Sequence, residues 1–218
     1  MKYFLLAFLL VLNCLCVSAK ETQSGKGIDE IVVTAEFNQD NPFNLPLSVS
    51  VLDSDDINKR NASHLEDLLF MAPNVNYSTG ASRGKFYQIR GIGERSGYLG
   101  TPNSSVGFLI DDIDYSGQGG IATLFDVDQV EVFRGPQGSR TGANALAGLI
   151  YIKTKDPTEK FEGTSELTFG DYGTQNIGVA FGGPLKNEKI KYRLVMRADY
   201  ADGFRKNTYL NKSDTSKK

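Results

Sequence analysis

The sequence predicts an α+β domain, made of a small mixed sheet with short helices, followed by the first antiparallel strands of a transmembrane β-barrel. Three observations predict this fold class. Between Val106 and Pro157, short apolar runs alternate with turns that are rich in Gly, Asp and Pro. Two segments between Ser54 and Met71 have the apolar spacing of short helices. From Phe161 onward, runs of about ten residues alternate strictly between apolar and polar side chains, which is typical of membrane β-strands.

Composition limits the class of function. The chain has 218 residues, a formal net charge of -2 and 23 glycines, which favours a turn-rich β protein of one domain with additional segments. A balance of charge this close to neutral does not suggest a nucleic-acid partner.

The N-terminal 19 residues have the pattern of a secretory signal peptide. Lys2 supplies the positive start, Tyr3 to Leu12 is apolar, and small residues precede a cleavage position after Ala19. The apolar run is shorter than the roughly 20 residues that a spanning helix needs. Both cysteines of the chain fall inside this segment, at positions 14 and 16, so the mature chain is expected to form no disulfide.

Residues 20–41 form a polar leader that contains one β-prone run, Ile28 to Glu36. Two interpretations remain open for this run. It is either a strand with an unpaired edge that adds to the sheet of another protein, or the first strand of the following domain.

The domain itself is expected to span residues 42–157. The predicted strands are Ser48–Leu52, Gln88–Gly91, Val106–Asp111, Val130–Arg134 and Leu149–Thr154. The predicted helices are Ser54–Arg60 and Ser63–Met71, the second with a capping box of Ser63 and Glu66 and a stop at Pro73. The single histidine, His64, lies at the start of this helix and is expected to be solvated or packed rather than catalytic.

Residues 158–218 are expected to supply three barrel strands. The alternating runs are separated by turns at Gly170–Gly173 and Gly183–Lys189. An ordinary antiparallel sheet with one wet face would show the same alternation. Since a plugged barrel has about 22 strands, the predicted barrel is incomplete.

Three motifs resemble those of TonB-dependent outer-membrane receptors: Glu131 to Gly138 (EVFRGPQG), Ile89-Arg90-Gly91, and Ile28 to Glu36 (IDEIVVTAE). The resemblance covers the N-terminal part of such a receptor, namely signal peptide, TonB box, plug domain and first barrel strands. It implies localisation in the outer membrane, contact with lipid through the barrel, and active uptake of a scarce small molecule, in this family most often a ferric siderophore.

The resemblance also implies roles for particular residues. The periplasmic protein TonB would pair with the TonB box, represented here by Ile31, Val32, Val33, Thr34 and Ala35. Plug arginines of the family anchor the plug to acidic residues of the barrel wall, and by position these are Arg90 and Arg134, with Glu131 assigned to the same anchoring group. The strand that holds Glu131 and Arg134 is expected to carry both charged residues out of the sheet. An internal ion pair between Arg134 and Glu131 is the alternative. Apex loops 78–86 and 94–105 would contact the ligand, with Arg83, Tyr87, Arg95 and Tyr98 as candidates.

No catalytic, metal or cofactor site is predicted. With one histidine and no mature cysteine, few nucleophilic schemes remain, so the chain is not expected to be an enzyme. Asp111, Asp112 and Asp114 do not have the spacing of a calcium loop and favour an aspartate-rich turn. The rival functional class is a stand-alone periplasmic plug-like protein that binds a ligand or partner without transport.

Overall fold

The computed structural model describes residues 32–33, 47–79, 83–97, 102–186, 189–202 and 207–211. Every described residue belongs to one compact unit, which begins at Ile31. The predicted signal peptide, most of the leader, and residues Ile31, Thr34, Ala35 and Tyr98 lie outside the described residues. No helix in the described part of the chain is long and apolar enough to cross a membrane.

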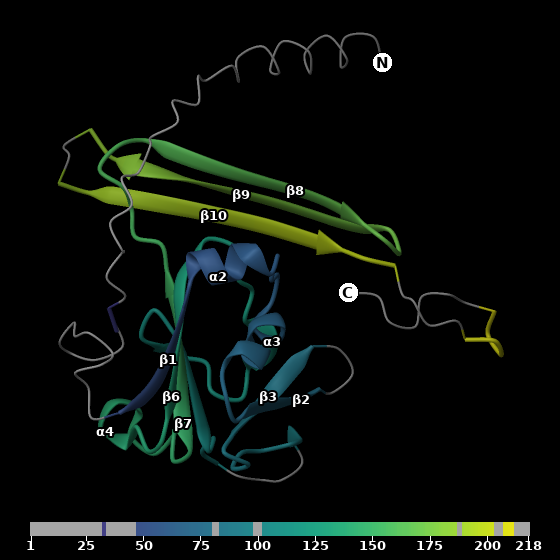
Figure 1. Ribbon diagram of the computed structural model, residues 1–218. Helices are drawn as coiled ribbons and strands as arrows, with labels where there is room; N and C mark the ends of the chain where they lie inside the picture. The colour runs from purple at the N-terminus through teal and green to yellow at the C-terminus, as the bar shows by residue number, and fades with distance from the viewer. Residues whose placement is uncertain are drawn as a thin grey trace. The chain divides into compact units, whose positions relative to one another are not determined.

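The described residues form short helices and three sheets (Figure 1). The strands are β1 (Ser48–Asp53), β2 (Val75–Thr79), β3 (Gly84–Ile89), β4 (Val106–Ile110), β5 (Ile113–Asp114), β6 (Val127–Arg134), β7 (Gly148–Thr154), β8 (Glu162–Gly170), β9 (Thr174–Pro184) and β10 (Lys191–Tyr200). The helices are α2 (Ser54–Lys59), α3 (Leu65–Leu68) and α4 (Gly138–Thr141), with 3-10 turns η2 (Leu69–Met71) and η4 (Gly119–Ile121).

The first sheet has five strands in the order β1-β6-β7-β4-β5. The β4–β7 pair is parallel and the other three pairs are antiparallel, so the sheet is mixed, as the sequence predicts. Residues Asp111 and Asp112 form the turn between β4 and β5, with left-handed φ angles of 46° and 69°. Aspartate tolerates this conformation better than most residues, which confirms the predicted aspartate-rich turn.

The predicted strand Gln88–Gly91 is wrong at both ends. Strand β3 stops at Ile89 and pairs with β2, a strand that the sequence analysis missed, to form a separate two-stranded sheet. Arg90 and Gly91 follow it in a turn with φ angles of 53° and 81°. A left-handed residue cannot continue an extended strand, so the chain leaves the sheet at Arg90.

Both faces of the five-stranded sheet are buried. Because neighbouring side chains of a strand point to opposite faces, Val130 and Val132 join one apolar cluster, whereas Phe133 joins the other. The first cluster also receives Leu65 and Leu68 from helix α3. The second contains residues from β4, β6 and β7 together with Val33 from the leader.

The second predicted helix is shorter than expected and begins one residue later. His64, not Ser63, is the N-cap, and its Nδ1 accepts a hydrogen bond from the backbone N–H of Glu66 at 3.3 Å. The carboxylate of Asp67 closes the capping box by accepting from the backbone N–H of His64 at 3.0 Å. The imidazole is fully buried, so His64 is the packed histidine that the sequence analysis allowed.

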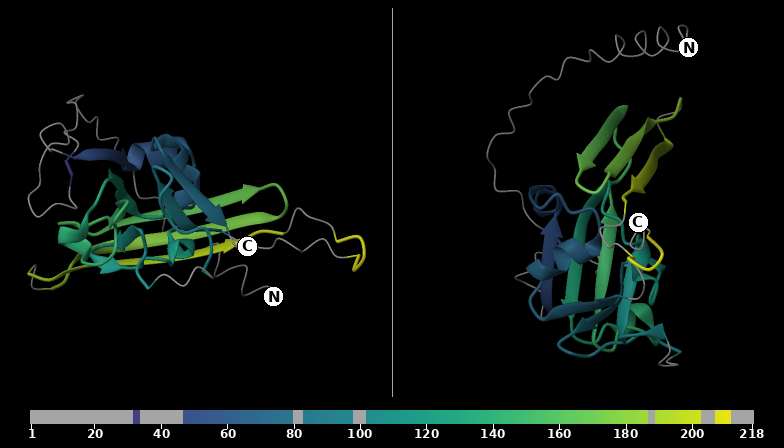
Figure 2. Two further views of the ribbon diagram at one scale, coloured as in Figure 1. Left: turned by 90° about the horizontal axis from the view of Figure 1, so that it is seen from below. Right: turned by 90° about the vertical axis from the view of Figure 1, so that its right-hand side faces the viewer.

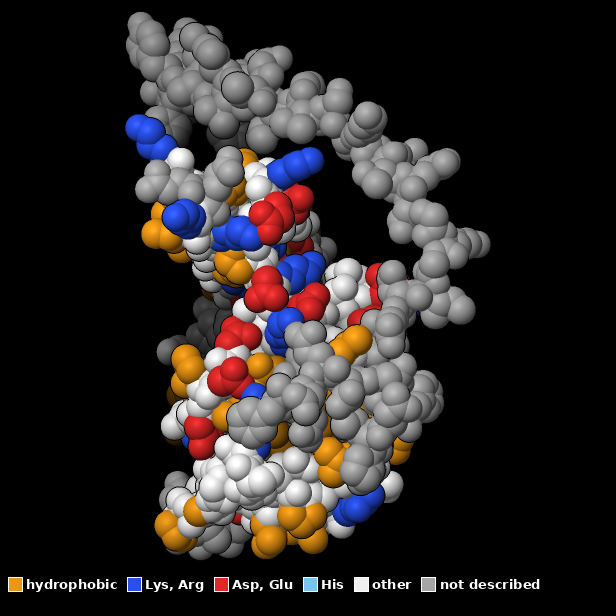
Figure 3. Space-filling model, turned by 90° about the vertical axis from the view of Figure 1, so that its left-hand side faces the viewer, with side chains coloured by type: hydrophobic (Ala, Val, Ile, Leu, Met, Phe, Trp, Pro, Cys, Tyr) orange, Lys and Arg blue, Asp and Glu red, His pale blue; other side chains and the backbone are white. Residues whose placement is uncertain are grey.

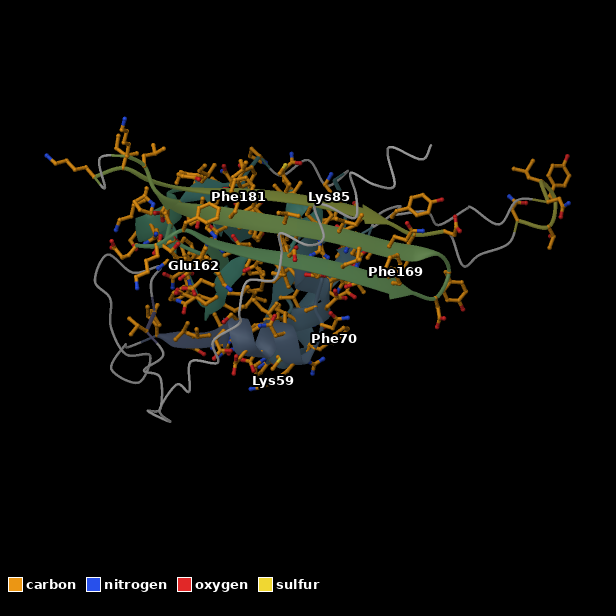
Figure 4. All side chains as sticks on the ribbon, turned by 90° about the horizontal axis from the view of Figure 1, so that it is seen from above. Lys59, Phe70, Lys85, Glu162, Phe169 and Phe181 are labelled. Atoms are coloured by element: carbon orange, nitrogen blue, oxygen red, sulfur yellow. The ribbon has the colours of Figure 1, made fainter. Side chains whose placement is uncertain are left out.

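Strands β8, β9 and β10 form an antiparallel sheet of their own, which Figure 2 shows as three long neighbouring arrows. Its register places the alternating apolar residues on one face. Leu167 pairs with Ile177, Phe181 pairs with Leu194, and Val179 pairs with Met196. Figure 4 labels Phe169 and Phe181 among these side chains, and Phe169 is 70% exposed. The predicted period of the three strands is thus confirmed, and the predicted turns differ from the observed ones by no more than two residues at either end.

Candidate functional site

The two described residues of the β-prone leader run contact strand β6. Val33 is fully buried against the second cluster, which includes Phe133 and Tyr151. The backbone carbonyl of Val32 accepts a hydrogen bond from Nε2 of Gln129 at 3.0 Å. At these positions the leader run therefore contacts the domain.

Glu131 lies on the same face of β6 as Gln129, and its side chain is fully buried. Its Oε1 accepts a hydrogen bond from the Gln129 amide at 2.5 Å. The prediction that the strand carries Glu131 out of the sheet is therefore wrong. Residues three apart on a strand point to opposite faces, which separates Glu131 from Arg134.

Arg134 and Arg90 lie near each other, on elements that are far apart in sequence. The Arg134 guanidinium donates through Nε to Ser48 Oγ at 3.0 Å and through Nη1 to Ser50 Oγ at 2.8 Å, both on β1. Burial lowers the pKa of Arg134, and the positive charge of Arg90 lowers it further. Among the described residues, neither guanidinium forms a salt bridge with a carboxylate. Two neighbouring cations without a counter-charge favour an acidic partner.

The candidate ligand-contacting residues have different surroundings. Arg95 is exposed. Arg83, which immediately precedes β3, lies 3.8 Å from the Glu66 carboxylate. Tyr87 is only 4% exposed, donates its hydroxyl hydrogen to the Gly119 carbonyl at 3.0 Å, and packs on Phe108. Burial raises the pKa of its hydroxyl. Tyr87 is therefore a core residue, and the prediction that it contacts a ligand is wrong.

The sequence analysis missed a contact between the turn before β6 and the three-stranded sheet. Arg193 of β10 donates through Nε and Nη2 to both carboxylate oxygens of Asp126, each at 2.5 Å. Beside it, the guanidinium of Arg197 lies 5.5 Å from the ring centroid of Phe125. The sequence does contain a signal for this contact, namely two arginines four residues apart on the polar face of one predicted strand. At this spacing both side chains project to the same side of the sheet.

A polar cavity of about 610 Å³ adjoins this contact. Amide and hydroxyl side chains form much of its lining, among them Asn58, Asn61, Thr168 and Asn176. In the part of the chain that the structure describes, no group of three or more His, Cys, Asp or Glu residues could hold a metal ion. On the side shown in Figure 3, acidic and basic side chains are intermixed, without a broad basic surface of the kind that binds nucleic acid.

Comparison with known proteins identifies the domain. Residues 41–149, which are half of the chain, match the family model described as the TonB-dependent Receptor Plug Domain. The chain belongs to the TonB-dependent receptors. The mixed five-stranded sheet with its short helices is therefore a plug, and the predicted fold class is confirmed.

Relatives and solved structures agree with this assignment. The vitamin B12 transporter BtuB of Vibrio vulnificus strain YJ016 is 27% identical over 203 residues, covering 90% of this chain and 31% of the relative. The ferripyoverdine receptor of Pseudomonas aeruginosa is 26% identical over 163 residues, covering 74% of this chain and 19% of the relative.

Among solved structures, the ferric yersiniabactin uptake receptor FyuA of Yersinia pestis superposes with a TM-score of 0.67 at 23% identity. This superposition covers 77% of this chain and 26% of that chain. The chain spans about a third or less of the length of these relatives. The comparisons show the family and the fold, and they name transport receptors rather than enzymes.

Proposed function

We propose that this chain is the plug and first wall strands of a TonB-dependent transporter in the outer membrane, and that the plug gates active uptake of a scarce small molecule. The observation that carries the proposal is the plug match over residues 41–149, followed directly by three strands of alternating polarity. The apolar face of those strands suits contact with outer-membrane lipid.

A ferric siderophore is the cargo that we propose. Relatives named as receptors for ferric enterobactin, ferripyoverdine and another siderophore support this choice, whereas others are named for vitamin B12 and hemin. On the plug, Arg95 is the exposed cationic residue among the original candidates, and Arg83 is partly engaged with Glu66. A guanidinium is suited to the anionic oxygens of a chelated ligand. Tyr98 remains a candidate outside the described residues.

TonB is the proposed periplasmic partner, with residues 31–35 as its binding segment. Backbone pairing with an added strand tolerates varied side chains and resists pulling along the strand. Because Val33 is buried and Val32 is bound by Gln129, this segment must first leave the plug in order to pair. The proposal thus requires a docked and a released form of the segment.

We also propose that Arg90 and Arg134 pair with acidic groups of the barrel wall beyond β10. Their proximity to each other and their lack of a carboxylate partner among the described residues support this role. Because Glu131 is buried in the plug, the anchoring role proposed for it is withdrawn. Replacing Arg90 with Ala in this chain should cost at most about 1 kcal/mol of stability, since it is an exposed cation.

Binding to TonB tests the proposal. The chain in detergent micelles is titrated calorimetrically with the periplasmic domain of TonB, alongside the variants Val33→Pro and Val33→Thr. Val33→Pro removes a backbone donor and should abolish binding, whereas Val33→Thr keeps the donor and the branched shape and should retain it. Equal affinity of all three proteins would contradict the assigned binding segment.

Membrane fractionation separates transport from the rival function. The expressed chain should be recovered in the outer-membrane fraction and resist extraction by alkaline carbonate. Recovery in the soluble periplasmic fraction as a folded monomer would instead support a stand-alone plug-like binding protein. The two tests are independent, because one probes the leader segment and the other probes the three-stranded sheet.

A further inference from the structure

Two neighbouring residues of the turn before β6, Phe125 and Asp126, contact the three-stranded sheet. Asp126 has a left-handed φ of 63°, which turns the chain sharply immediately before β6 begins at Val127. Its carboxylate accepts from Nε and Nη2 of Arg193 in a bidentate pair, with the two side chains only 4% and 11% exposed. A bidentate pair of this kind fixes direction as well as distance.

The ring of Phe125 forms the second part of this contact, against strands β9 and β10. Gly178 lies on the same face of the sheet as Arg197, its registered partner on β10. A Cβ at Gly178 would stand 2.7 Å from the Phe125 ring, closer than carbon atoms can approach. The glycine thus leaves room for the ring, and Arg197 covers it. We call Phe125 and Asp126 the plug tip.

The charges on the three-stranded sheet favour Asp126 as the partner of Arg193. Arg197 is paired with Asp199 through Nε at 2.9 Å and with Glu166 at 3.4 Å, so its charge is balanced within the sheet. Among the described residues, the one ion pair formed by Arg193 is with Asp126. Both side chains are nearly removed from water, so replacing either one leaves the other as an uncompensated buried charge, which is strongly unfavourable.

We propose that the plug tip is the contact that seats the closed plug on strands β9 and β10, and that plug opening requires the Asp126–Arg193 pair to break. This inference rests on the proposed gating function. Its polarity is the reverse of the Arg90 and Arg134 anchors, since here the plug supplies the acid and the wall supplies the arginine.

The position of the plug tip directly before β6 connects it with the leader. Gln129, three residues after Asp126, holds the carbonyl of Val32. A pull on the leader is therefore applied to β6 close to the Asp126–Arg193 pair. A force that breaks the hydrogen bond between Gln129 and Val32 therefore acts near the end of β6 that Arg193 holds through Asp126.

A distance measurement between the plug and the sheet tests this inference without ligand or TonB. Both native cysteines precede residue 20, so the processed chain accepts spin labels at Lys59→Cys on α2 and Leu194→Cys on β10. Double electron–electron resonance in micelles should give one narrow distance distribution. Asp126→Asn and Arg193→Gln should each broaden it, and the double variant should be no broader than either, because each change removes the same pair.

Asp128→Asn is the matched control, since it removes a carboxylate two residues away that has no ion pair among the described residues. Its distribution should stay narrow. Near-UV circular dichroism establishes that the plug is folded in each variant. If Asp126→Asn unfolds the plug, the test rests on the distance distribution of Arg193→Gln alone, because Arg193 lies outside the plug. A narrow distribution for Arg193→Gln, or broadening that adds in the double variant, overturns the proposal.

Discussion

His64 allows a quantitative test of how the plug is held together. Its imidazole is fully buried at the start of α3, and Nδ1 accepts the hydrogen bond of the Glu66 backbone N–H. Replacement by Ala removes both the cap and the buried ring. Replacement by Asn also removes the ring but keeps a good capping acceptor. The difference in unfolding free energy between the two variants therefore isolates the cap, and should be about 0.5–2 kcal/mol in favour of Asn.

The same residue predicts a pH dependence. Burial lowers the pKa of His64 and the charge of Arg83 lowers it further, whereas Glu66, Asp67 and the Gly120 carbonyl oppose this shift. The folded state thus favours the neutral ring more than the unfolded state does, whose pKa is about 6.5. Stability is fully present above that pH and is lost as the pH falls toward the lowered folded value, since a proton on Nδ1 also abolishes the cap.

The assay is urea unfolding followed by near-UV circular dichroism at several pH values between about 5 and 8, the range in which histidine titrates. The wild-type chain should lose stability toward the acidic end more steeply than His64→Asn does. The reasoning is refuted if His64→Asn is as unstable as His64→Ala, or if the wild-type and His64→Asn profiles run parallel.

Three further changes test other parts of the fold. Gly148→Ala should destabilise the plug by more than about 2 kcal/mol, because a Cβ there would stand 2.2 Å from the Phe133 carbonyl oxygen at a φ of 159°. Gly120→Ala, with open space around it, should stay within about 0.5 kcal/mol in the same urea titration. Val33→Ala should weaken the packing of the leader on the plug by roughly 1.5 kcal/mol and thereby strengthen TonB binding up to about tenfold, as measured by calorimetry. Weaker TonB binding would show that packing of the leader on the plug does not compete with TonB. A chain that ends at Pro157 should be monomeric by light scattering without detergent, whereas the full chain should aggregate because its sheet exposes apolar residues; equal solubility would contradict the lipid-facing assignment.

Local pattern determined the elements of this protein. The strands from β8 to β10 follow from period-two alternation, and the register of the structure keeps the predicted apolar residues on one face. Strands β4 and β7 follow from apolar runs that end at glycine- and aspartate-rich turns. These signals lie within a few residues of one another, so the sequence alone contains them.

The residue that caps the start of helix α3 was less predictable from the sequence. Ser63 with Glu66 and His64 with Asp67 offer the same spacing, one residue apart. Burial of the imidazole against the core selects the second pair. Propensity alone favours serine as an N-cap, and tertiary packing overrides that preference here.

The tertiary structure decided which polar residues are available for function. Alternation along β6 places Glu131 in the interior, while Arg134 reaches the serines of β1. Tyr87 belongs to the core because Gly119 and Phe108 meet it there, from segments distant in sequence. The plug tip depends on the same kind of contact, since Asp126 and Arg193 are separated by 67 positions. The sequence determined the alternation along strands such as β8 to β10, but a carboxylate's partner depends on which strands the fold brings together.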